Sequence, residues 1–228
     1  MKTDFLIIGG GIIGLTIAKG LRKKYPEKSI VIIEKETSTG FHASGRNSGV
    51  LHAGFYYSRD SLKAKFTKNG NQRIKLYCKE NKLRLNENKK VVVTQNESEL
   101  EGLFELEKRG RDNRVEVSIV NEKELADIEP NAKTFQYALY SPSTATIDPK
   151  EIINCLVSEL TGTAVKIITG SGYRKKISDN AIRTTSGLII EFGFLINAAA
   201  LYADKIVELK EGKILRTGKY NELFSENV

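Results

Sequence analysis

Apolar and polar positions near the start of the chain predict a strand, a helix and a second strand. A short continuous apolar run at residues 5–8 is closed by glycines, which is typical of a buried parallel strand. Residues 12–24 follow the spacing of a helix, and a second apolar run at 29–34 predicts another buried strand. We therefore expect residues 1–34 to form a βαβ unit, the building block of α/β folds.

The pattern changes in the middle of the chain. A stretch rich in small and polar residues at 40–48 predicts a loop, and residues 61–80 return to helical spacing. The elements expected beyond it are a strand at 90–93, a helix at 97–109, a strand at 115–120 and a short helix that begins after Asn121, with Glu124 completing a capping box. This mixture predicts an α+β insertion in the α/β fold.

Strands return in the last third of the chain. Asp148 and Pro149 form a good helix start, a carboxylate followed by proline at the first helical position, and the helix should run to about residue 160. The strands expected after it are 165–168, 173–177, 181–185, 188–192 and 194–197, with a hairpin turn at Ser186-Gly187 and a helix from Leu201.

Composition and charge narrow the class of protein only slightly. The 228 residues are 40% hydrophobic and 28% charged, which is ordinary for a globular protein and large enough for a real core. The formal charge of +8 comes from Lys and Arg spread along helices, so we expect a solvated surface and no nucleic-acid partner. Cys78 and Cys155 form no CxxC pair, so no metal site is expected. The first apolar run is too short for a signal or a span, which favours a cytoplasmic protein and leaves peripheral membrane association open.

Three glycines follow the first strand with the spacing Gly9-x-Gly11-x-x-Gly14, and Glu34 ends the second strand. In this context the pattern predicts a dinucleotide site, although a structural turn without a ligand is the alternative. Gly9 permits a tight turn, Gly11 lets the backbone approach a pyrophosphate, and Gly14 allows the helix to pack closely on the sheet. Glu34 would accept hydrogen bonds from ribose hydroxyls.

The segment beyond Glu34 is similar to a known family of flavoproteins. The run SGRNSGVLHAGFYY, from Ser44 to Tyr57, resembles the flavin-contacting segment of the D-amino-acid-oxidase-like FAD superfamily, and more narrowly the L-2-hydroxyglutarate oxidase/dehydrogenase family. The likeness continues through residues 61–65, 146–148 and 197–204. It implies FAD as the cofactor and a Rossmann-type FAD-binding domain with an α+β substrate-domain insertion.

The same resemblance implies a set of cofactor contacts. They are Gly9, Gly11, Gly14, Glu34, Lys35, Ser44, Arg46, Asn47, Ser48, Gly49, Tyr173, Ala199 and Ala200. Two of these positions depart from the family pattern, because Arg46 stands where His is frequent and Ala200 where the family has Gly. Relatives also continue well beyond residue 228, and residues 217–220 resemble the start of a substrate-domain segment.

This resemblance gives the expected domain boundaries. Residues 1–84 form the first part of the FAD-binding domain, 85–145 the substrate-domain insertion, 146–208 the second part of the FAD-binding domain, and 209–228 the start of a further substrate-domain segment. A chain without the remainder would leave sheet edges uncovered, so we expect weak cofactor retention and consider a second polypeptide that supplies the missing part.

His52 is the candidate catalytic base, because oxidation of a 2-hydroxy acid needs an acceptor for the hydroxyl proton. Its alternative is a histidine that only hydrogen-bonds the flavin or the backbone. Arg46 would bind a carboxylate or balance flavin charge, or be an ordinary surface residue. Adjacent Tyr56 and Tyr57, expected on a strand, are more typical of core packing than of catalysis. His42 could equally be a loop residue or a residue of the site.

The leading functional hypothesis is an FAD-dependent oxidoreductase that oxidises a small 2-hydroxy acid, with L-2-hydroxyglutarate implied by the resemblance. A quinone-linked acceptor or oxygen would reoxidise the flavin. The alternatives are an amino-acid or glycerol-3-phosphate oxidase of the same superfamily, and a catalytically silent FAD-binding fragment.

Overall fold

The computed structural model describes residues 1–205, 208–210 and 213–216, so the segment at 217–220 lies outside the described residues. The chain divides into two compact units, one made of residues 1–47 with the described residues from Pro149 onward, the other of residues 48–148. The first boundary falls well before the expected position at 84/85. The helix expected at 61–80 therefore belongs to the second unit, and the assignment of the units as FAD and substrate domains stays a prediction.

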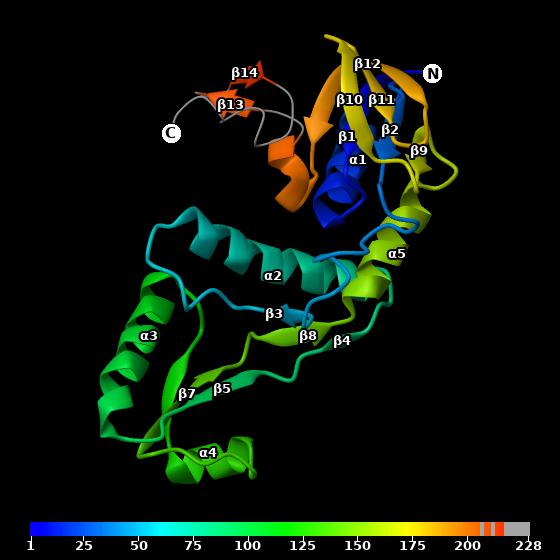
Figure 1. Cartoon of the computed structure of the whole chain (residues 1–228). Coiled ribbons are helices and arrows are strands. Elements are labelled where there is room, and N and C mark those ends of the chain that lie inside the picture. The colour runs from blue at the N-terminus through cyan, green and yellow to red at the C-terminus, as the bar shows by residue number, and fades with distance from the viewer. Residues whose placement is uncertain (206–207, 211–212, 217–228) are drawn as a thin grey trace. The chain divides into compact units, whose positions relative to one another are not determined.

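The first unit is built on a six-stranded sheet with the order β10-β11-β12-β1-β2-β9 (Figure 1). Strands β12, β1, β2 and β9 run parallel, whereas β10, β11 and the start of β12 pair antiparallel. The bounds are β1 Lys2–Ile8, β2 Ile30–Ile33, β9 Val165–Ile168, β10 Tyr173–Ser178, β11 Ala181–Thr184 and β12 Ile189–Asn197. Helices α1 (Ile12–Lys24) and α5 (Pro149–Leu160) accompany the sheet, and the short 3₁₀ helix η2 (Ala200–Lys205) follows β12.

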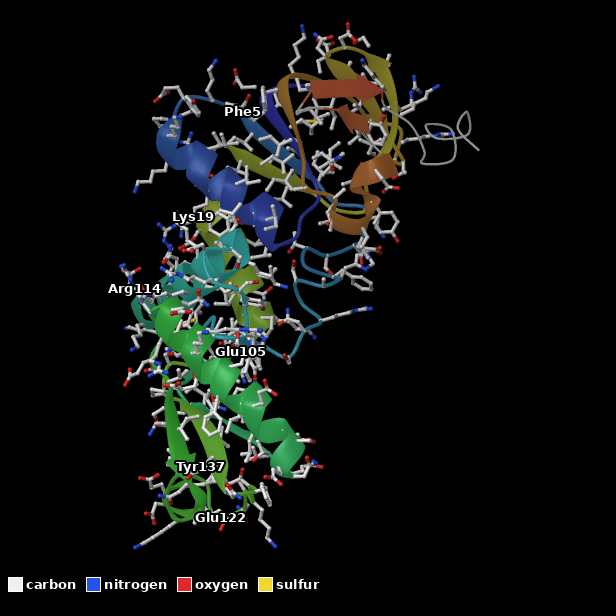
Figure 2. All side chains as sticks on the ribbon, turned by 90° about the vertical axis from the view of Figure 1, so that its left-hand side faces the viewer. Phe5, Lys19, Glu105, Arg114, Glu122 and Tyr137 are labelled. Carbon is white, nitrogen blue, oxygen red and sulfur yellow. The ribbon has the colours of Figure 1, made fainter. Side chains whose placement is uncertain are left out.

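Both faces of the central strands are buried, which explains their continuous apolar runs. Leu6, Val31 and Ile190 belong to one buried cluster, while Ile7 lies on the α1 side, with its Cγ2 close to Gly14. Helix α1 also contacts α5, and Lys19, labelled in Figure 2, places its Nζ 2.6 Å from Glu159 Oε2. The predicted βαβ unit is confirmed, with α1 at the predicted residues.

Strand β12 is one continuous strand, so the prediction of separate strands at 188–192 and 194–197 was wrong. Its first part pairs with β11, where Ile190 lies opposite Ile182, and its later part pairs with β1, where Phe194 lies opposite Phe5. Gly193 interrupts the apolar pattern without ending the strand. A Cβ added at Gly193 would lie 3.0 Å from the Asp4 carbonyl oxygen, so the missing side chain lets β12 pass close to β1.

The second unit combines two small sheets with helices. The sheets have the orders β3-β8-β4 and β5-β7-β6. The bounds are β3 Val50–Leu51, α2 Leu62–Glu80, β4 Leu85–Asn86, β5 Lys90–Val93, η1 Glu97–Glu99, α3 Leu100–Asp112, β6 Ser118–Asn121, α4 Glu122–Ile128, β7 Tyr137–Ser141 and β8 Ala145–Ile147. Strands β3, β4, β7 and β8 were not predicted. The core gathers around Phe55, Leu103 and Leu139.

Two local predictions in this unit have different outcomes. The capping box is confirmed, because Asn121 Oδ1 accepts the Glu124 N–H at 3.0 Å and Glu124 Oε2 accepts the Asn121 N–H at 2.8 Å. The strand expected from 115 begins only at Ser118. Helix α3 runs to Asp112, three residues farther than predicted. The Val115 N–H then donates to the Gly110 carbonyl at 2.8 Å, so residue 115 belongs to the turn that ends the helix and not to the strand.

Candidate functional site

A cavity of about 510 Å³ opens in the first unit, where the carboxyl ends of β1, β2 and β12 meet. Parallel strands present their carboxyl ends on one edge of the sheet, and ligands of α/β folds bind there. The lining residues are Ile8, Gly9, Gly11, Ile33, Glu34, Lys35, Gly40, Phe41, His42, Ala43, Ser44, Arg46, Gly172, Tyr173, Thr185, Ala198, Ala199, Ala200, Leu201 and Tyr202. All of them belong to the first unit.

The glycine turn after β1 leaves no room for a side chain at Gly9 or Gly14 and little room at Gly11. Gly9 has φ +112°, and a Cβ there would lie 2.4 Å from the Ala198 carbonyl oxygen. A Cβ on Gly14 would lie 2.0 Å from the carbonyl oxygen of Gly9, and one on Gly11 would lie 3.0 Å from Ser44 Oγ. Gly9 and Gly14 thus allow close packing of β1 with β12 and α1, while Gly11 leaves room beside the start of the helix.

Helix α1 begins at the cavity, and the loop at 40–48 supplies its cap. The N-cap residue, Gly11, has no side chain, but Ser44 Oγ accepts the Ile12 N–H at 3.0 Å. Ser44, which is distant in sequence, therefore accepts a hydrogen bond that an N-cap side chain usually accepts. The partial positive charge of the helix N-terminus favours an anionic group such as a pyrophosphate at this place.

Glu34 is 8% exposed and lines the cavity. Its Oε2 accepts the Gly10 N–H at 2.8 Å, and its Oε1 accepts the Glu36 N–H at 3.0 Å. The carboxylate therefore anchors the glycine turn, a role that the sequence did not reveal. Each carboxylate oxygen has a further acceptor position, so these bonds remain compatible with the expected bond to a ribose hydroxyl.

A charged cluster surrounds Lys35 at the cavity. Lys35 Nζ contacts Glu36 Oε1 and lies 3.0 Å from His42 Nε2, which is itself 2.8 Å from Glu36 Oε1. The ammonium also lies 4.5 Å from the centre of the Tyr202 ring. Glu36 raises the pKa of Lys35, while Lys35 and then His42 lower the pKa of Glu36, so both groups stay charged at neutral pH. His42 lies in the predicted loop at 40–48, and it also lines the cavity.

The structure brings most of the predicted cofactor contacts together. Those that line the cavity are Gly9, Gly11, Glu34, Lys35, Ser44, Arg46, Tyr173, Ala199 and Ala200. Gly14 lies in α1 behind the turn, and Asn47 Nδ2 donates to the Ala43 carbonyl at 2.9 Å within the loop. Ser48 and Gly49 belong to the second unit and do not line the cavity. The cofactor role of every one of these residues stays a prediction.

Three lining residues deserve comparison with the expectations from sequence. The Arg46 guanidinium lies 4.2 Å from the centre of the Phe41 ring, a cation–π contact at the cavity. Ala200 has φ +50°, in the left-handed region that favours glycine, at the position where the family pattern has glycine. Gly172 was missed, although a Cβ there would lie 2.8 Å from Lys35 Cβ; a glycine beside a strand start was the available signal.

His52 lies in the second unit, just after β3, with its side chain exposed. Loss of hydration around the ring lowers its pKa below 6.5, and the positive charge of Lys90 lowers it further. The imidazole is therefore neutral near pH 7 and can accept a proton. Tyr56 and Tyr57 lie in a turn and not on a strand, and the Tyr56 ring packs 4.3 Å from that of Phe55.

The glycine turn, the anchored carboxylate and the parallel sheet define a Rossmann-type dinucleotide-binding protein. A family model described as FAD dependent oxidoreductase matches residues 4–222. The chain therefore belongs to this FAD-dependent oxidoreductase family, the D-amino-acid-oxidase-like family, in which FAD is the cofactor.

Relatives and solved structures agree with this family. The L-2-hydroxyglutarate dehydrogenase of Escherichia coli O17:K52:H18 (strain UMN026 / ExPEC) is 35% identical over 209 residues, covering 90% of this chain and 49% of that protein. Glycine oxidase from Geobacillus kaustophilus has a TM-score of 0.78 at 21% identity, covering 91% of this chain and 59% of that one. L-alpha-glycerophosphate oxidase from Mycoplasma pneumoniae has a TM-score of 0.77 at 22% identity, covering 100% and 67%. The chain spans about half the length of the curated relatives it matches.

The described residues contain neither a candidate membrane-spanning helix nor a candidate metal site. No helix in this part of the chain has both the length and the apolar character to cross a bilayer. Within the same residues, no group of three or more His, Cys, Asp or Glu side chains is placed to hold a metal ion.

Proposed function

We propose that the protein uses FAD to oxidise a small 2-hydroxy acid, with L-2-hydroxyglutarate as substrate and 2-oxoglutarate as product. The observation that carries this proposal is the 35% identity with an L-2-hydroxyglutarate dehydrogenase over 90% of the chain. Glycine oxidase and glycerophosphate oxidase are similar in fold at 21% and 22% identity, and likeness at that level supports the fold alone. Bound FAD supplies the acceptor for the hydride from the substrate carbon, and a quinone-linked acceptor or oxygen takes the electrons afterwards.

The cavity of the first unit fits this cofactor on three grounds. Gly9 and Gly14 have no room for a side chain, and helix α1 presents its positive end beside Ser44. Glu34 keeps acceptor positions for ribose hydroxyls. Lys35 lies at the same place with a full positive charge. These residues would hold the adenosine and pyrophosphate portions.

His52 would act as the base in the reaction. As the C2–H bond gives up its hydride and the carbonyl forms, the hydroxyl proton must leave, and a neutral ring nitrogen of His52 would accept it. The lowered pKa of His52 keeps that nitrogen unprotonated at neutral pH. This is the proton balance that oxidation of an alcohol to a ketone requires.

The test is anaerobic reduction of the bound flavin by candidate substrates. Reduction is measured as the loss of the visible absorbance of the flavin. L-2-hydroxyglutarate should bleach the flavin, and glycine, D-alanine and glycerol 3-phosphate should not. His52→Gln should retain FAD and slow bleaching by about a hundredfold or more, the usual contribution of a general base. Bleaching by an amine substrate alone, or by glycerol 3-phosphate alone, would refute the proposal.

A second candidate is FAD binding without turnover by this chain. The observation that favours it is that the dinucleotide cavity lies wholly in the first unit, whereas His52 belongs to the second. Purified chain that shows flavin bands but is not bleached by L-2-hydroxyglutarate would support this candidate. A colourless chain that cannot be reconstituted with FAD would refute both candidates.

A further inference from the structure

The side chains of His52, Tyr56 and Lys90 form a cluster in the second unit. The rings of His52 and Tyr56 lie edge to face, with centroids 6.2 Å apart. Lys90, at the start of β5, places its Nζ 4.7 Å from the centre of the Tyr56 ring. The positive charge of Lys90 also acts on His52, whose pKa it lowers. An imidazole, a phenol ring and an ammonium thus share one place on this unit.

Lys90 differs in its partners from two other lysines of the second unit, Lys75 and Lys79. Lys75 and Lys79 each lie 3.2 Å from a carboxylate oxygen of Glu87. Within the part of the chain that the structure describes, Lys90 has no salt bridge, and its ammonium rests on the face of Tyr56. A cation held over an aromatic ring and half-buried keeps its charge available for an anion.

The segment around His52 is held rigidly by two asparagines. Asn71, on α2 and 6% exposed, donates from Nδ2 to the carbonyls of Leu51 at 2.9 Å and Ser143 at 3.1 Å. Asn113 donates from Nδ2 to the Tyr57 carbonyl at 2.8 Å and the Gly54 carbonyl at 3.3 Å. The backbone is thus fixed on both sides of the His52–Tyr56 pair, as a preorganised binding site requires.

We propose that Lys90 binds a carboxylate of the acid substrate while His52 receives the proton of its hydroxyl group. The inference rests on the proposed function and adds to it the residue that recognises the acid. An ammonium at this place supplies the charge that a hydroxy acid needs and that an alcohol does not. Lys90 is therefore a specificity-determining residue of the second unit.

Binding through Lys90 has a consequence for His52. The carboxylate offsets the positive field of Lys90 and brings a negative charge near the imidazole, so the pKa of His52 rises on binding. The base becomes stronger once an acid is in place. This coupling provides a measurement that does not depend on turnover or on bound flavin.

The test is the titration of the histidine ring signals by proton NMR, with glutarate as the probe. The chain has two histidines, His42 and His52, so the signals are assigned by one His42→Gln variant. Glutarate should raise the midpoint of His52 and leave that of His42 unchanged. Its uncharged counterpart, glutaramide, should move neither.

Lys90→Met keeps the length of the side chain and removes its charge. It should raise the midpoint of His52 without ligand and weaken glutarate binding about tenfold or more. Lys90→Arg keeps the charge and should keep the response to glutarate. Lys89→Met is the matched control, because the neighbouring Lys89 lies over a different ring, 5.8 Å from the centre of Tyr140, and should behave as the unmodified chain.

An unchanged response to glutarate in a folded Lys90→Met protein would overturn the inference, as would an equal response to glutaramide or no response of the unmodified chain to saturating glutarate. Folding of each variant is checked by its urea midpoint. If glutarate binds through Lys90 and L-2-hydroxyglutarate fails to bleach the flavin, the proposed function fails alone. If bleaching occurs and Lys90→Met has an unaltered KM, the inference about Lys90 fails alone.

Discussion

Replacement of Gly14 by alanine tests the steric requirement of the glycine turn. The new Cβ would lie 2.0 Å from the Gly9 carbonyl oxygen, whereas ordinary contact begins at 3.4 Å, so α1 and the turn must separate by more than an ångström. Overpacking of a well-packed interior typically costs about 1–3 kcal/mol. The better helix propensity of alanine returns about 1 kcal/mol. Because the clash is with backbone, we place the overpacking cost at the upper end and expect a net loss of about 2 kcal/mol.

Gly20→Ala is the matched control in the same helix. A Cβ at Gly20 meets nothing within 4 Å, so this change should stabilise the protein by about 0.5–1 kcal/mol through helix propensity alone. Urea unfolding measures both, with the slope of the transition held constant. FAD titration by flavin fluorescence measures the affinity for the cofactor. This affinity should fall for Gly14→Ala and stay unchanged for Gly20→Ala. Equal stability of the two variants, or a Gly14→Ala protein as stable as the parent, would refute the steric reasoning.

Three further changes test other parts of the first unit. Ser44→Ala removes the acceptor of the Ile12 N–H and should cost about 1 kcal/mol, with weaker FAD binding, by urea unfolding and FAD titration. Ala200→Gly relieves a left-handed alanine and should stabilise the protein by about 1 kcal/mol, so a lower urea midpoint would contradict it. Lys28 and then Ser29 lower the pKa of Asp4 to about 2 from 3.8, so its contribution to stability is complete above pH 3.8 and is lost as pH falls through 2. Asp4→Asn should flatten the stability profile in that window, measured by unfolding at stepped pH, and an unchanged profile would count against the contact.

The sequence predicted the first unit well because its signals are local. The apolar runs at 5–8 and 29–34 are continuous because the strands are buried on both faces, and the glycines mark the turn between them. The capping box at Asn121 is likewise contained in four residues. Where backbone sterics and short-range hydrogen bonds decide the structure, pattern reasoning reaches the correct elements.

The parts that the sequence did not predict depend on distant contacts. Strands β3 and β8 are too short for a period and exist because Val50 pairs with Thr146, far along the chain. The compact units divide after residue 47, whereas the sequence predicted a domain boundary after residue 84, and nothing in the helical pattern of residues 62–80 shows that Asn71 donates to Leu51 and Ser143. Similarly, the second role of Glu34 depends on the position of the Gly10 N–H, which only the folded turn defines.

The cavity of the first unit and the side-chain cluster of the second unit differ in how well the sequence predicts them. The site of the first unit is made mostly of backbone and of absent side chains, and glycine spacing records such features directly. The cluster of the second unit is made of side chains whose positions come from β5 and from the turn at Tyr56, and no spacing rule joins Lys90 to His52. Gly14 belongs to the first unit and Lys90 to the second. We therefore predict that lesions at these two positions affect separate properties, namely FAD binding and the proposed recognition of the acid.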